Sequence, residues 1–118
     1  MNIDEILCIQ SDLQRRMGNP MDGGTGNVNT GVRENMLAMI VEAVEVLNEV
    51  NWKPWKPPTK VIDRERIVSE LIDVLQFWAN AVNAVGLTED DLIEAYRAKL
   101  AICYRRIDQG ETTNAKAK

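Results

Sequence analysis

Apolar side chains recur every three or four residues in four stretches of the chain, which is the spacing of one face of an α-helix. The stretches are residues 3–17, about 32–51, about 63–85 and 88 to about 108. The third stretch is apolar nearly all the way round, which predicts a central helix covered on several sides. Because the chain shows no alternating strand pattern and no internal repeat, its sequence predicts an all-α fold.

Helix-breaking residues separate these stretches. Residues 18–32 hold five of the seven glycines, which predicts a flexible loop that is either functional or a plain connector. Residues 52–61 include three prolines and therefore predict an extended connection. Gly86 is expected to end the third helix, and Thr88 with Asp91 to cap the start of the fourth.

Length and composition predict one domain over residues 1–118, with a frayed tail at 111–118. No apolar run approaches the ~20 residues that a membrane span needs, so no membrane partner is expected. The acidic start and the two cysteines favour a cytoplasmic protein with reduced thiols. A net charge of −4 argues against binding of a nucleic-acid polymer.

The chain contains no histidine, and this narrows its chemistry. A Ser-His-Asp triad, a histidine general base and a histidine-liganded zinc or di-iron site are all excluded. An enzyme of this sequence must work with carboxylates, lysines and arginines.

Acidic residues interrupt two of the predicted helices, each of which is otherwise rich in apolar residues. On each helix the acids recur at three or four residues, so they share one face. Without a partner, a carboxylate carried into a helix interface costs several kcal/mol. The acids are Glu42, Glu45 and Glu49 on the second helix and Glu70 and Asp73 on the third.

Two interpretations of these acids are open. In the first they form solvated faces, and the acids of the third helix pair with an arginine such as Arg64 or Arg66. In the second the two helices pack antiparallel and bring four of the carboxylates together. Such a cluster needs a cation, and ligands that are all oxygen select Mg²⁺ or Mn²⁺.

The acids resemble the signature of the all-α NTP pyrophosphohydrolase superfamily, which includes the MazG proteins and the dimeric dUTPases. The match is Glu42-x-x-Glu45, then 24 residues, then Glu70-x-x-Asp73. The segment EAVEVLNEVNWKPWK, in which a tryptophan- and lysine-bearing loop follows the first acidic helix, resembles the phage-type dimeric dUTPases and MazG-like proteins.

The segment YRAKLAICYRRIDQGE is similar to the dUTPase ending. The matching positions are Tyr96, Lys99, Arg106 and Gly110, whereas Cys103, Ile107 and Glu111 depart from the pattern. These departures leave the base open between dUTP and another deoxynucleotide such as dGTP, dATP or dCTP.

The resemblance implies an enzyme that hydrolyses a deoxynucleoside triphosphate to the monophosphate and diphosphate, with Mg²⁺ as cofactor and Mn²⁺ as a substitute. Glu42, Glu45, Glu70 and Asp73 would hold the metal. One of them, or Glu49, would orient or deprotonate the water that attacks the α-phosphorus.

Further residues are candidates for binding the substrate, and solvation or core packing is the alternative explanation for each. Among the basic candidates, Lys99 and Arg106 are favoured because both fit the dUTPase ending. On the third helix, an aromatic ring and an amide continue the face of the acids, where they suit a nucleoside. The phosphate candidates are Lys53, Lys56, Lys99, Arg105 and Arg106. The nucleoside candidates are Gln10, Trp52, Phe77 and Asn80.

The resemblance also implies a four-helix, MazG-like bundle assembled as a homodimer or homotetramer. Self-association is expected on physical grounds too, because four helices cannot hide all the apolar faces that this sequence carries. Two other classes stay open: a non-catalytic helical interaction module, and an acidic cation-binding protein, although no EF-hand-type loop is present.

Overall fold

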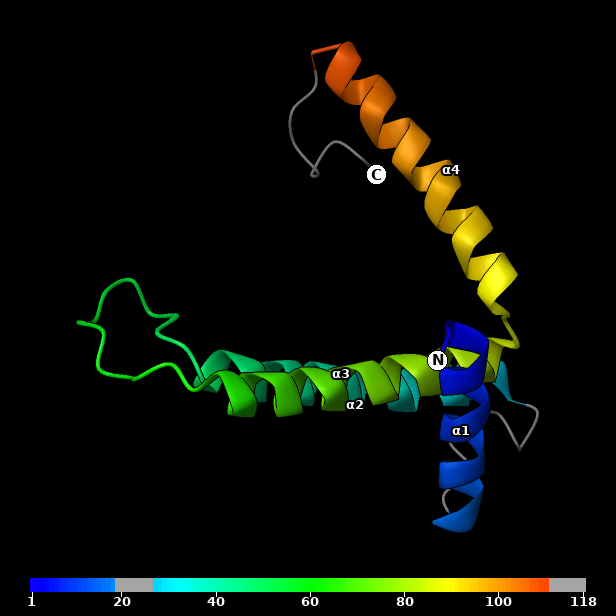
Figure 1. The fold of residues 1–118 in the computed structure, drawn as a ribbon, viewed down its shortest axis with the longest axis horizontal. Helices are drawn as coiled ribbons and strands as arrows, with labels where there is room; N and C mark the ends of the chain where they lie inside the picture. The colour runs from blue at the N-terminus through cyan, green and yellow to red at the C-terminus, as the bar shows by residue number, and fades with distance from the viewer. Residues whose placement is uncertain (19–26, 111–118) are drawn as a thin grey trace. The chain divides into compact units, whose positions relative to one another are not determined.

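The computed structural model describes residues 1–18 and 27–110. Over these ranges the chain forms four helices and no strand, which confirms the all-α prediction. The helices are α1 (Ile3–Arg16), α2 (Val28–Asn48), α3 (Arg64–Val85) and α4 (Glu89–Asp108) (Figure 1). Most of the loop predicted at 18–32 and the tail predicted at 111–118 lie outside the described residues.

Polar residues cap the start of every helix. Asn2, Asn27 and Asp63 accept hydrogen bonds from the first backbone amides of α1, α2 and α3. Thr88 and Asp91 form the predicted reciprocal capping box at the start of α4. These side chains satisfy amides that the helices themselves leave unpaired.

The bounds of α2 differ from the prediction of a helix over about 32–51. The helix begins four residues earlier because the side chain of Asn27 accepts a hydrogen bond from the amide of Thr30 at 3.0 Å. It ends three residues earlier, at Asn48, with Glu49 as its C-cap. A polar side chain that binds a backbone amide therefore sets the start of this helix.

The chain divides into two compact units, Met1–Gly86 with α1 to α3 and Leu87–Lys118 with α4. Gly86 ends α3 in the left-handed conformation at φ 86°, as predicted. That residues 1–118 behave as one domain stays a prediction. No helix of the described residues is long and apolar enough to cross a membrane.

In the first unit, α2 and α3 lie side by side and run antiparallel, and α1 packs across the end of α3 that lies away from the 49–63 connection (Figure 1). The amide nitrogen of Asn83 donates to the carbonyl oxygen of Leu7 at 2.9 Å and so anchors α1 on α3. The buried apolar residues of the described chain are Leu7, Ala79, Ala81, Val82 and Ala84. The core therefore lies where α1 meets α3.

The other half of α3 corrects the prediction of a helix covered on several sides. Val68, Leu71 and Ile72 are 46–49% exposed. Of the described helices of the first unit, α2 packs along this half, and α1 contacts the opposite end. The α2–α3 pair thus exposes a broad aliphatic surface.

Candidate metal and nucleotide site

Carboxylates of α2 and α3 meet on the antiparallel pair. One ligand oxygen each of Glu42, Glu70 and Asp73 lies within 4.8 Å of the others, and all three residues are partly buried. Carboxylate oxygens bind Mg²⁺ at about 2.0–2.1 Å, so oxygens this close can surround one ion. The group confirms that antiparallel packing brings acids of both helices together.

The electrostatics of this group favour binding of a cation. The pKa of the Glu70 carboxyl is raised above its ordinary value of 4.5. The first cause is partial burial, which disfavours the charged form, and the second is repulsion by neighbouring carboxylates. In order of effect these neighbours are Asp73, Glu45, Glu42 and Glu49.

Arginines do not neutralise the acids of α3. Within the described part of the chain, neither Glu70 nor Asp73 has an ion pair. Arg66 instead pairs with Glu49, with 3.3 Å between its Nε and the carboxylate Oε1. The interpretation in which Arg64 or Arg66 pairs with the acids of α3 is therefore wrong.

The other two predicted acids, Glu45 on α2 and Glu49 at its C-cap, occupy different surroundings. Glu45 is exposed and lies outside the group of three, although its charge still contributes to the raised pKa of Glu70. The side chain of Glu49 is only 16% exposed and is held by Arg66. Their roles as a fourth metal ligand and as a base stay predictions.

Three amide side chains of α1 and α3 are buried. Asn80 is fully buried, and Gln10 and Gln14 are 5% and 4% exposed. Within the described residues, neither amide atom of Asn80 nor the Oε1 of Gln14 has a hydrogen-bond partner. A buried polar group without a partner costs about 1–3 kcal/mol, so a ligand that supplied one would be favoured here.

The sequence predicted Gln10 and Asn80 as nucleoside-binding residues, whereas Gln14 was missed. Gln14 lies four residues after Gln10, on the face of α1 that also carries Leu7, and this spacing was the available signal. Phe77, the aromatic residue predicted to bind the nucleoside, is partly buried and lies one turn before Asn80 on α3. Their role in binding a nucleoside stays a prediction.

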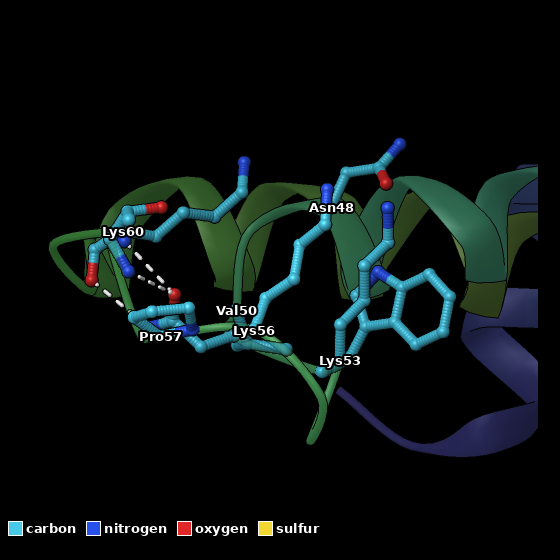
Figure 2. Close-up of a pocket in the computed structure, with 9 residues that line it drawn as sticks. Asn48, Val50, Lys53, Lys56, Pro57 and Lys60 are labelled. Atoms are coloured by element: carbon cyan, nitrogen blue, oxygen red, sulfur yellow. Dashed lines mark hydrogen bonds between the residues drawn. The ribbon is translucent and has the colours of Figure 1, made fainter.

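The connection after α2 forms a basic pocket of about 380 Å³, shown in Figure 2. Trp52 packs edge-on against Trp55 with 5.8 Å between ring centroids, and the Nζ of Lys53 lies 5.3 Å from the Trp52 ring centroid. Sequence reasoning selected Lys53 and Lys56 but missed Lys60. The lining residues are Asn48, Val50, Asn51, Trp52, Lys53, Lys56, Pro57, Thr59 and Lys60.

The remaining phosphate candidates belong to α4, in the second unit. Lys99 and Arg105 are exposed, and Arg106 is partly buried. Their role in binding phosphate stays a prediction.

Acids facing each other across two antiparallel helices, in an all-α chain without histidine, fit a metal-dependent hydrolase of nucleoside triphosphates. A family model described as dUTPase matches residues 2–85, which include the acids and the connection that forms the basic pocket. The chain therefore belongs to this all-α dUTPase family. No curated protein and no solved structure shows significant similarity to the chain.

Family membership shows a hydrolase that acts on nucleoside triphosphates, and it favours the enzyme over the helical interaction module. Members of the family are typically metal-dependent, and the group of Glu42, Glu70 and Asp73 could bind the metal. The match ends before α4, so it does not test the similarity of residues 96–110 to the dUTPase ending.

Proposed function

We propose that the protein hydrolyses a deoxynucleoside triphosphate, dUTP or another such as dGTP, to the monophosphate and diphosphate with Mg²⁺ or Mn²⁺. The observation that carries this proposal is the group formed by Glu42, Glu70 and Asp73. Its oxygens converge, no arginine of the described chain neutralises the acids of α3, and the donor set consists of oxygen alone. This donor chemistry selects hard divalent cations.

In this reaction the carboxylates hold the metal and the attacking water. Glu42, Glu70 and Asp73 are the ligands, with Glu45 as the fourth. When bound there, Mg²⁺ would neutralise charge on the phosphates and activate the attacking water. One of the carboxylates, or Glu49, accepts a proton as the water oxygen bonds to the α-phosphorus. The bond from this phosphorus to the bridging oxygen breaks, and diphosphate leaves.

Basic side chains neutralise the charge of the departing diphosphate. Lys53, Lys56 and Lys60 lie in the connection that follows the C-terminal end of α2. No carboxylate of the described residues pairs with them. In the proposed function Lys53 and Lys56 take this role, and binding of phosphate by Lys99, Arg105 and Arg106 of the second unit stays a separate prediction.

The nucleoside lies along α3, on the side of the acids that is away from the basic pocket of the connection after α2. Asn80 follows Asp73 by seven residues, or about 10 Å at 1.5 Å per residue. Phe77 lies between them and offers a ring for stacking. Asn80 and Gln10 offer amides for hydrogen bonds to the base or sugar. Trp52 lies in the connection after α2, on the other side of the acids, so its contact with the base stays a prediction.

Product analysis tests this assignment directly. We expect diphosphate release from at least one of dUTP, dGTP, dATP, dCTP and dTTP when each is incubated side by side with the protein and Mg²⁺. EDTA should abolish the release, and Mn²⁺ should restore it. Release of orthophosphate would contradict the assigned cleavage position.

Metal should stabilise the fold because it relieves repulsion in the acidic group. Mg²⁺ or Mn²⁺ at millimolar concentration is expected to raise the melting temperature by mass action.

Without metal, Glu70→Gln should melt above the parent. Its advantage should grow as the pH rises above 4.5, because a raised folded-state pKa makes ionisation of Glu70 cost stability. Metal-insensitive melting, or an advantage that grows at acidic pH, would argue against this cluster.

We propose further that the protein is at least a homodimer. The aliphatic surface of α2 and α3 is unusually exposed for a chain with so small a core, and surfaces of this kind mark interfaces. Its members, 43–60% exposed, are Leu37, Ile40, Val41, Val44, Leu47, Val68, Leu71 and Ile72.

Light scattering with a matched pair of variants tests the assembly. The parent should scatter as a dimer or tetramer, and Leu71→Glu should shift it toward monomer. Val61→Glu, which adds the same charge at a loop residue that is 92% exposed, should leave the mass unchanged. A parent that is a stable, fully active monomer of 13.3 kDa at nanomolar concentration would refute the assembly.

A further inference from the structure

The loop after α2 is tied together at its base by one side chain. The Oδ1 of Asn51 accepts hydrogen bonds from the backbone amides of Thr59 and Lys60 at 3.0 and 2.9 Å. Its Nδ2 donates to the carbonyl oxygen of Lys60 at 3.0 Å. A single amide thus joins the start of the loop to its end, eight and nine residues later.

The segment inside this closure has its own local order. The amide of Lys56 donates to the carbonyl oxygen of Lys53 at 3.2 Å, which closes a turn with Pro54 at its second position. Proline fixes the backbone φ angle that this position of a turn requires. The edge-on contact of Trp52 with Trp55 spans the same turn.

The closed loop carries three lysines and no acid. Lys53, Lys56 and Lys60 line one pocket, and Figure 2 shows their side chains extending to the same side of the loop. None of the three has an ion pair with a described residue. Three like charges held together repel one another, so a multivalent anion is the ligand that this pocket fits.

We propose that Asn51 is a positioning residue that closes residues 51–60 and thereby holds Lys53, Lys56 and Lys60 as a pocket for the diphosphate end of the substrate. This inference rests on the proposed function. The pocket begins at Asn48, six residues after Glu42 on α2, which is about 9 Å along the helix axis. Phosphates beyond the one held at the acids would therefore approach the loop.

The test measures binding of inorganic diphosphate to the full chain in EDTA, where metal at the acidic group cannot contribute. Asn51→Ala should weaken binding about tenfold, equivalent to about 1.4 kcal/mol, because the lysines are no longer held together. Lys60→Gln leaves the backbone closure intact and removes one charge, so it should weaken binding as well. The matched controls are Asn29→Ala and Arg15→Gln, exposed positions on α2 and α1 that should bind as the parent does.

Kinetics separate positioning from a general loss of structure. Asn51→Ala should raise the KM for the triphosphate about tenfold and change kcat little, because the lysines contact diphosphate in the ground state and the transition state alike. Its melting temperature and its Mn²⁺ affinity should match the parent's. A lowered kcat with unchanged KM would overturn the positioning role.

The outcomes distinguish this inference from the proposed function. If the triphosphates are hydrolysed while Asn51→Ala and Lys60→Gln leave diphosphate affinity and KM unchanged, the inference is wrong and the function stands. If no triphosphate is hydrolysed but diphosphate affinity falls in both variants, the pocket stands as an anion site and the function is wrong.

Discussion

Asp73→Asn is expected to lower the turnover of the preferred deoxynucleoside triphosphate by about a hundredfold or more while the protein stays folded. The substitution keeps the side-chain shape but removes one negative charge from the three converging oxygens. Metal-based charge stabilisation is worth several kcal/mol, and each 1.4 kcal/mol corresponds to a factor of ten in rate. Steady-state release of diphosphate at saturating Mg²⁺ measures the effect.

The matched control is Asp12→Asn on α1, where an exposed aspartate pairs with Arg15 and Arg16. It should change turnover by less than twofold, because a surface ion pair contributes ~0–1 kcal/mol and this one lies outside the acidic group. Isothermal titration with Mn²⁺ should show weaker binding for Asp73→Asn alone. An Asp73→Asn enzyme with parental turnover would show that Asp73 is not a metal ligand.

The fold was predictable from the sequence because its signals are local. The spacing of apolar residues located four helices, and Gly86 and the Thr88–Asp91 pair marked a helix end and a helix start that the structure confirms. The start of α2 was missed because the glycine-rich segment before it predicted a loop through residue 32. The helix in fact starts within that segment, where the side chain of Asn27 caps it. A single hydrogen bond of this kind has no periodic signature.

The acidic group was predictable for a different reason. Carboxylates on apolar helix faces are costly, so their presence on two helices left two explanations open, pairing with arginines or a shared cation. The choice among the acids was not available, because it depends on how the helices pack. Arg66 reaches Glu49 rather than the acids of α3, and Glu45 points outside the group of three.

Residues that act through the backbone or through burial gave weaker signals. Asn51 stands among polar loop residues, and nothing in the sequence shows that its amide binds backbone groups eight and nine residues later. Gln14 reads as a surface residue in the sequence, but it is only 4% exposed in the structure. Tertiary contacts, rather than local sequence, therefore decide the outer parts of the site.

Asn80→Leu is expected to separate stability from activity in opposite directions. Asn80 is fully buried, and its amide has no hydrogen-bond partner within the described residues, so an apolar side chain of similar size should leave the melting temperature unchanged or raised. The same substitution should lower kcat/KM by about a hundredfold or more, because a site that hydrogen-bonds a substrate loses that much when the bond cannot form.

Asn83→Leu provides the contrast, one turn further along α3. Its amide is already satisfied by the carbonyl oxygen of Leu7 at 2.9 Å, so its loss should lower the melting temperature by removing a bond that anchors α1. Thermal melts and kcat/KM measured on both variants decide the role of Asn80. An Asn80→Leu protein that melts lower and keeps parental kcat/KM would show that Asn80 packs the core and does not bind the nucleoside, since a binding role predicts the reverse of both results.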